Sequence, residues 1–130
     1  MIVVDASAIV DVMLRIESAA PVAQRLLDPD TTLHAPQLLD LEVLQVLRRF
    51  AAMGLWQSER ATEALADFSA LRIVRHQHEP MRWRIWELRK NVTAYDAAYL
   101  ALAETLSCPL VTRDAKLQRA TSHDAVVEVL

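Results

Sequence analysis

Four acidic side chains, far apart along the chain, stand in surroundings where an isolated carboxylate is costly. They are Asp5 after the apolar run IVV, Glu42 within QLLDLEVLQVLRRF, Asp96 within TAYDAAYLALAE, and Asp114 within TRDAKL. A carboxylate beside apolar packing destabilises the fold by several kcal/mol unless something compensates its charge. A ligand shared by the four acids would supply that compensation.

Carboxylates brought close together cannot all stay ionised unless cations hold them. Hard oxygen ligands select Mg²⁺ or Mn²⁺ over zinc, and His76, His78 and His123 show no ligand spacing. A carboxylate-held Mg²⁺ in an open crevice suits phosphodiester hydrolysis, because the metal lowers the pKa of a water and neutralises charge that builds on the phosphate.

The elements that must position these acids alternate between strand and helix. Strands are predicted over residues 1–5, 32–35, 72–75, 109–112 and 125–130. Helices are predicted over residues 7–14, 19–27, 36–53, 58–71 and 80–88, and two more helices begin at residues 93 and 114. In this interpretation Ser7 caps the first helix, Pro36 lies in the first turn of the long helix, and Gly54 follows its end. The alternation predicts an α/β fold with a parallel sheet covered on both faces, in one domain over residues 1–130.

The predicted topology brings the four acids to one edge of the sheet. Asp5 ends the first strand and Asp114 lies two residues past Thr112, which ends the fourth, so the two are neighbours if these strands pair. Glu42 lies in the second turn of a helix that starts at the same carboxyl edge. The helix with Asp96 has about thirteen residues and spans roughly 20 Å, the depth of the sheet, so its N-terminus returns to that edge.

Each acid also has an ordinary structural interpretation, and taken singly that interpretation is the more common one. The alternatives are a capping box of Asp96 with Thr93, an N-cap role for Asp114, an N-cap role for Asp5 beside Ser7, and an ion pair of Glu42 with Arg48 or Arg49. The shared edge favours the site, because three independent caps and an ion pair have no reason to converge.

The composition narrows the function classes. A single cysteine, Cys108, excludes an internal disulfide and indicates a reducing cytoplasm. The N-terminus lacks the basic region of a signal peptide, and no apolar stretch is long enough to cross a bilayer. The only glycine is Gly54, which excludes the glycine-rich phosphate and dinucleotide loops. The net charge of −3 argues against a general nucleic-acid binder unless the acids hold cations.

Basic residues near the predicted crevice are candidates for RNA contacts. They are Arg49, which shares a helix face with Glu42 and Gln45, and Arg113, Lys116 and Arg119, which flank the fourth acid. The segment MRWRIWELRK, residues 81–90, adds basic and tryptophan side chains that suit phosphates and bases. The alternative is that Met81, Ile85 and Leu88 form a packed stripe and the tryptophans are core or interface residues.

The motifs VVDAS, APQLLDLEVLQVLRR, TAYDAAYLALAE and TRDAKL together resemble the PIN-domain nucleases, most closely the VapC-like toxins of bacterial toxin–antitoxin pairs. The resemblance covers essentially the whole chain. It implies a three-layer α/β/α fold with a five-stranded parallel sheet in the order 3-2-1-4-5, Mg²⁺-dependent endoribonuclease activity, and a small VapB-like antitoxin as partner.

Carried over position by position, the resemblance assigns the catalytic and metal-binding roles to Asp5, Glu42, Asp96 and Asp114, and the hydroxyl positions beside them to Ser7 and Thr112. The family often has Asn where this chain has Gln45, a longer amide. Some members carry a further acid where Ala115 and Lys116 stand, and this difference argues against a tightly held second metal.

The expected partner binds at the crevice and at an apolar groove around Leu14, Ile16 and the 36–53 helix. The same kind of surface suits a homodimer, the commonest assembly of identical chains. The alternative function is a PIN-fold binding module that has lost catalysis; loss of any of the four acids would favour it, and all four are present.

Overall fold

The computed structural model describes residues 1–54 and 58–130 of the chain. Its strands are β1 (Ile2–Val4), β2 (Leu33–Pro36), β3 (Ile73–His76), β4 (Leu110–Thr112) and β5 (Val127–Val129). They form one parallel sheet in the order β3-β2-β1-β4-β5, with Val3 opposite His34 on one side and Val4 opposite Val111 on the other. The predicted strand order is confirmed, and every strand end lies within two residues of its prediction.

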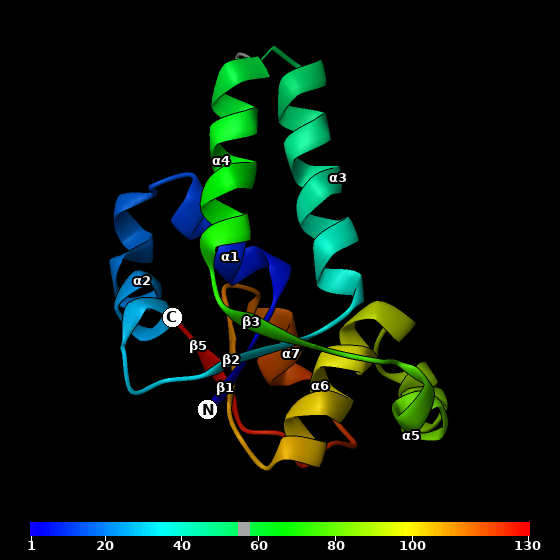
Figure 1. Cartoon of the computed structure of the whole chain (residues 1–130). Helices are drawn as coiled ribbons and strands as arrows, with labels where there is room; N and C mark the ends of the chain where they lie inside the picture. The colour runs from blue at the N-terminus through cyan, green and yellow to red at the C-terminus, as the bar shows by residue number, and fades with distance from the viewer. Residues whose placement is uncertain (55–57) are drawn as a thin grey trace.

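The helices are α1 (Ala6–Met13), α2 (Ala20–Leu27), α3 (Leu38–Ala52), α4 (Ser58–Ala70), α5 (Arg82–Glu87), α6 (Ala94–Leu106) and α7 (Ala115–Arg119). Right-handed crossovers place α1 to α4 on one face, because the chain moves from β1 to β2 to β3 in one direction. The chain then returns to β4 on the opposite face, which α6 covers with α5 beside it (Figure 1). The three-layer α/β/α architecture is therefore confirmed.

The core explains why α6 is so rich in alanine. The strands β1 and β4 are buried along their whole length, and seven consecutive residues of α6, from 97 to 103, are buried as well. Alanine side chains let this helix approach the central strands closely, and its apolar character on all sides fits a helix enclosed by other elements. The N-terminus of α6 is thereby held at the carboxyl edge of β1 and β4.

Two predicted details are wrong. Asp5, not Ser7, is the N-cap of α1, with its Oδ1 accepting from the backbone N–H of Ala8 at 3.0 Å. Pro36 ends β2 instead of starting α3. Because the N–H of Gln37 donates to His76 on β3, the nitrogen of Pro36 faces the β1 side, where pairing has already ended, so its missing N–H costs no ladder bond.

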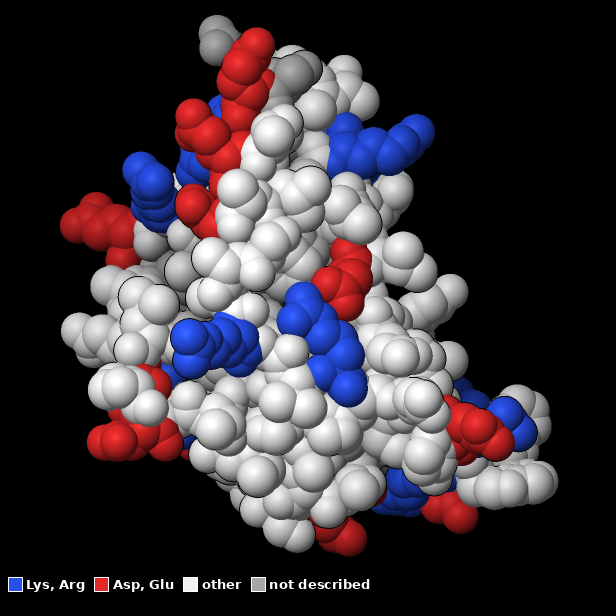
Figure 2. Space-filling model, viewed as in Figure 1, with Lys and Arg blue, Asp and Glu red and all other residues white. Residues whose placement is uncertain are grey.

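Gly54 follows the C-cap of α3 with φ of +69°, as its predicted place just past the helix end requires. The α3–α4 hairpin extends away from the sheet, and on the face shown in Figure 2 acidic side chains gather along the outer part of α4 and basic ones lie at the far end of α3. None of the helices in the described parts of the chain combines the length and apolar character needed to span a membrane.

Candidate active site

Asp5 is the most enclosed of the four acids, with 6% of its surface exposed. It lies directly after β1, and its carboxylate accepts hydrogen bonds from the hydroxyl of Ser7 at 2.7 Å, the hydroxyl of Thr112 at 2.5 Å and the N–H of Ala8. Burial raises the pKa of Asp5, the three hydrogen bonds lower it, and the nearby charge of Asp114 raises it; burial is the largest effect, so the pKa is raised.

Two hydroxyls fix the Asp5 carboxylate and link it to the turn after β4. Each hydroxyl has one proton, and those of Ser7 and Thr112 are both directed at Asp5. Their oxygens, 3.3 Å apart, in turn accept from the backbone: Ser7 from the N–H of Arg113 at 2.9 Å, and Thr112 from the N–H of Asp114 at 2.9 Å. The structure thus places both predicted hydroxyl residues against the first acid and, through the backbone, beside the fourth.

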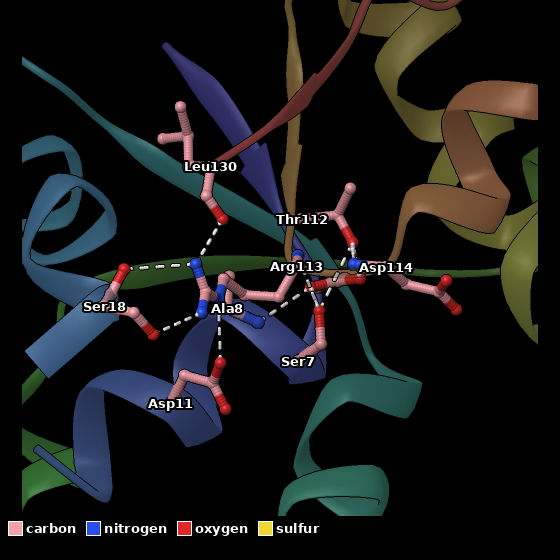
Figure 3. Close-up of polar contacts among 9 residues, drawn as sticks. Ser7, Ala8, Asp11, Ser18, Thr112, Arg113, Asp114 and Leu130 are labelled. Atoms are coloured by element: carbon pink, nitrogen blue, oxygen red, sulfur yellow. Dashed lines mark hydrogen bonds and ion pairs between the residues drawn. The ribbon is translucent and has the colours of Figure 1, made fainter. Parts of the chain in front are cut away.

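Arg113 holds the same turn from its other side (Figure 3). Its guanidinium donates to the Asp11 carboxylate at 2.8 Å, to the hydroxyl and carbonyl of Ser18, and to the carbonyl of Leu130. A guanidinium with these four acceptors is occupied by the fold, and this argues against the RNA contact predicted for Arg113. Its observed role is to fasten the end of β4 to α1 and the C-terminal strand.

Glu42 reaches the site from α3 and is held by a residue that sequence reasoning missed. The hydroxyl of Tyr99, a side chain only 2% exposed, donates to Glu42 Oε2 at 2.6 Å. Tyr99 stands one turn after Asp96 in an alanine-rich helix, and a tyrosine there requires a polar partner for its hydroxyl, which was the available signal. The alternative ion pairs of Glu42 with Arg48 or Arg49 do not occur in the described residues.

The pKa of Glu42 is raised above its ordinary value. Burial is the main cause, the charges of Asp5 and Asp96 add to it, and the Tyr99 hydroxyl opposes it. Burial together with the bond to Glu42 also raises the pKa of Tyr99, so this phenol stays protonated and remains a donor. The arrangement keeps the Glu42 carboxylate next to two other acids.

Asp96 lies in the first turn of α6, whose N-cap is Thr93, as predicted. The backbone N–H of Asp96 donates to the Thr93 hydroxyl at 3.2 Å. Its half-buried carboxyl has a raised pKa because of burial first and the charge of Asp114 second, with the Thr93 hydroxyl and Lys116 lowering it. Thr93 therefore caps the backbone and also acts on the carboxylate, which in addition lies within the field of another acid, Asp114.

Asp114 is the N-cap of α7, with its Oδ1 accepting from the N–H of Lys116 at 2.8 Å. Capping roles thus exist for both Asp5 and Asp114, but they occupy only part of each carboxylate. The charge effects connect the whole set, since Asp114 acts on Asp5 and Asp96, and both of these act on Glu42. The structure brings the four predicted acids into one electrostatic neighbourhood.

The side-chain oxygens at this site suit a divalent cation that keeps part of its water shell. The donors are hard carboxylate and hydroxyl oxygens, which suit Mg²⁺. Within residues 1–54 and 58–130, no group of three or more His, Cys, Asp or Glu side chains is placed so that it could hold a metal ion directly. A tight all-protein cage is therefore not present, whereas Mg²⁺ commonly keeps several waters and binds through one or two carboxylates together with substrate phosphates.

The remaining predicted residues line two hollows on either side of these acids. Gln45 and Arg49 share a hollow of about 370 Å³ with Glu42 and the exposed Leu41. Lys116 and Arg119 share a hollow of about 740 Å³ with Asp96. Gln45 and these cations therefore share hollows with the acids, although no contact between Gln45 and an acid is among the hydrogen bonds of the described residues.

Comparison with protein families identifies residues 2–122 as matching the PIN domain model. The chain is 37% identical over 130 residues to the protein named ribonuclease VapC12 of Mycobacterium tuberculosis, covering 100% of this chain and 99% of that protein. It is 41% identical over 117 residues to the ribonuclease VapC9 of the same organism, covering 90% and 88%.

Two solved structures share the fold at low sequence identity. One is VapBC2 from Rickettsia felis bound to a DNA fragment from its promoter, with a TM-score of 0.73, 16% identity, and coverage of 99% of this chain and 98% of that chain. The other is VapC20 of Mycobacterium tuberculosis, described as a sarcin–ricin loop cleaving toxin, with a TM-score of 0.68, 12% identity, and coverage of 92% and 94%.

Proposed function

Because this chain belongs to the PIN-domain family, we propose that it is a metal-dependent endoribonuclease and the toxin of a toxin–antitoxin pair. The observation that carries the proposal is the meeting of four acids from four distant segments at one sheet edge, where burial first, and then the charges of neighbouring acids, raise the pKa values of Asp5, Glu42 and Asp96. The ribonuclease names of relatives with 37% and 41% identity support RNA as the substrate.

In this proposal Asp5, Glu42, Asp96 and Asp114 are the catalytic acids and hold Mg²⁺, with Mn²⁺ as a substitute, some of them through water. The bound metal supplies an activated water and neutralises negative charge on the phosphate. Asp5 is the central ligand, because it is the most buried acid and three donors fix its orientation. Ala115 and Lys116 stand where some family members carry a further acid, and this argues against a tightly held second metal.

The other side chains position these groups and the substrate. Ser7 and Thr112 hold the Asp5 carboxylate, and Tyr99 holds Glu42. Lys116 and Arg119, which line the same hollow as Asp96, are placed to contact RNA phosphates. Arg49 and Gln45 line the hollow on the Glu42 side, where Arg49 can meet either a phosphate or an acidic partner.

An inhibitory partner is also part of the proposal. The solved relative VapBC2 supports a VapB-like antitoxin for this chain. On α3, Leu41 is 71% exposed and Leu44 42% exposed, and Leu41 lines the hollow that reaches Glu42. An apolar helix docked there, followed by a cationic or amide side chain that reaches the carboxylates, would block the site. Exposed apolar residues on the same hairpin also favour a homodimer.

Cleavage of RNA by the purified protein tests the proposal. Labelled RNA is incubated with the protein in Mg²⁺, in Mn²⁺ and in excess EDTA, and the fragments are resolved on a gel. We expect internal cuts with either metal and none with EDTA. Full activity in EDTA would exclude the metal mechanism, whereas intact RNA under all three conditions would favour the alternative of a catalytically silent binding module.

A further inference from the structure

Two tryptophan side chains of the segment 81–90 lie in solvent instead of the core. Trp83 is 78% exposed and Trp86 59% exposed, whereas Met81 and Leu88 of the same segment are buried. The predicted packing stripe therefore exists, but the tryptophans are not part of it. Large aromatic side chains that lie exposed beside one another mark a binding surface, because burying their apolar area against a ligand is favourable and leaving it in water is not.

These tryptophans line a groove of about 530 Å³ that also contains Arg82 and Arg89. The Arg89 guanidinium lies 4.5 Å from the centre of the Trp86 ring and also donates to the Trp86 carbonyl at 2.9 Å. A cation is thus fixed over one face of the indole, while much of the ring remains open. The groove offers aromatic faces and positive charge together.

The groove leads to the candidate active site. Its residues Arg89, Val92 and Thr93 also line the hollow of about 740 Å³ that contains Asp96. Figure 1 shows α5 beside α6, at the side of the molecule where α6 begins. We call the two adjoining hollows the tryptophan track; it runs from Trp83 and Trp86 past Thr93 to Asp96.

The charge of the track is opposite to that of the whole chain. Five basic side chains line it: Arg82, Arg89, Lys90, Lys116 and Arg119. Among the described residues that line the two hollows, Asp96 is the acid, and it belongs to the site. The neighbouring Arg84, in contrast, is neutralised by Glu104 at 2.8 Å and Glu87 at 3.0 Å. A ligand with regularly spaced negative charges and flat rings complements this surface.

We propose that the tryptophan track binds single-stranded RNA, with an unpaired base stacked on Trp86 or Trp83 and flanking phosphates on Arg82 and Arg89. The inference rests on the proposed nuclease function and names a surface that binds its substrate. Stacking on an aromatic side chain requires an exposed base face, which a base inside a duplex does not offer. The track therefore selects unpaired segments and leads them to Asp96.

Binding of a fluorescently labelled single-stranded RNA oligonucleotide, measured by anisotropy in EDTA with its integrity checked on a gel, tests the proposal. We expect Trp86→Leu to weaken binding about ten-fold and Trp86→Phe to stay within about two-fold of the parent, because phenylalanine still stacks. Arg89→Ala should lower the slope of log affinity against log salt by about 0.7. The matched control is Arg72→Ala, an exposed cation before β3 at the opposite sheet edge, which should change neither quantity.

Cleavage of RNA in Mg²⁺ and molar mass by light scattering are measured for the same proteins. If the parent cleaves and binds RNA while Trp86→Leu and Arg89→Ala bind it equally well, the track is wrong and the nuclease function stands. If Trp86→Leu binds RNA normally but changes from dimer to monomer, the groove is an interface between copies. If the parent neither binds nor cleaves any RNA, both proposals are refuted.

Discussion

Removal of the Tyr99 hydroxyl tests whether α6 positions the acid on α3. In Tyr99→Phe the ring remains in its buried place, and only the 2.6 Å bond to Glu42 is lost. A hydrogen bond to a charged group contributes about 1.5–3 kcal/mol. Because Glu42 is half-buried, water can replace the hydroxyl in part, so we expect a cost of about 1.5 kcal/mol at pH 8, at the lower end of that range.

The cost should depend on pH in a defined direction. The Tyr99 bond lowers the pKa of Glu42 against the effect of burial, so the bond stabilises the fold more when Glu42 is ionised. Its contribution is present above the pKa of Glu42 and decreases as pH falls through it, where a neutral bond of about 0.5–1 kcal/mol remains. The destabilisation by Tyr99→Phe should therefore be smaller at pH 5 than at pH 8.

Urea denaturation of metal-free protein at the two pH values measures this difference. Tyr95→Phe is the matched control, since Tyr95 lies on the same helix with 65% of its surface exposed. RNA cleavage should also fall in Tyr99→Phe, because Glu42 loses the group that orients it. A loss of stability that is equal at both pH values, or cleavage equal to that of Tyr95→Phe, would refute a positioning role for Tyr99.

Three further perturbations follow from the same network. Asp5→Asn should abolish cleavage. The metal-free stability of this variant relative to the parent should rise from pH 5 to pH 8 in thermal melts, because the pKa of Asp5 is raised and the parent therefore loses stability as pH rises through it. A difference in stability that stays constant with pH would contradict this. Thr112→Val should cost about 2 kcal/mol in urea denaturation, because the fully buried hydroxyl donates to Asp5 and accepts from Asp114, and Thr112→Ser should recover most of it. Arg113→Ala should cost about 2–3 kcal/mol through its lost bonds to Asp11, Ser18 and Leu130, against no measurable loss in Arg72→Ala.

The sheet and the four acids were predictable from the sequence for a physical reason. Parallel strands place all their carboxyl ends at one edge, so the apolar runs before Asp5 and Thr112 fix where those residues lie. Helix length fixed Asp96 in the same way, because a helix that spans the sheet must return its N-terminus to that edge.

Side-chain pairing across distant elements was not predictable. The sequence gives no sign that Tyr99 meets Glu42, 57 residues away, or that Arg113 binds Asp11 and Leu130. Pro36 was predicted in a helix because proline is common in a first turn. The strand β2 instead continues through Pro36, because β1 has already ended beside it and no ladder bond needs the missing N–H. The exposure of Trp86 was equally hidden, because a helical stripe of Met81, Ile85 and Leu88 leaves open what covers the other face.

Binding of Mn²⁺ to the RNA-free protein, followed by electron paramagnetic resonance, shows whether the four acids hold the metal. Free Mn²⁺ gives a sharp signal that decreases when the ion binds protein. We expect the parent and the control Asp67→Asn, an exposed acid of α4, to reduce this signal equally, and Asp5→Asn and Asp96→Asn to leave it close to that of Mn²⁺ alone. Equal uptake by the parent, Asp5→Asn and Asp96→Asn would show that the metal is held elsewhere, and the assignment of the four acids would be wrong.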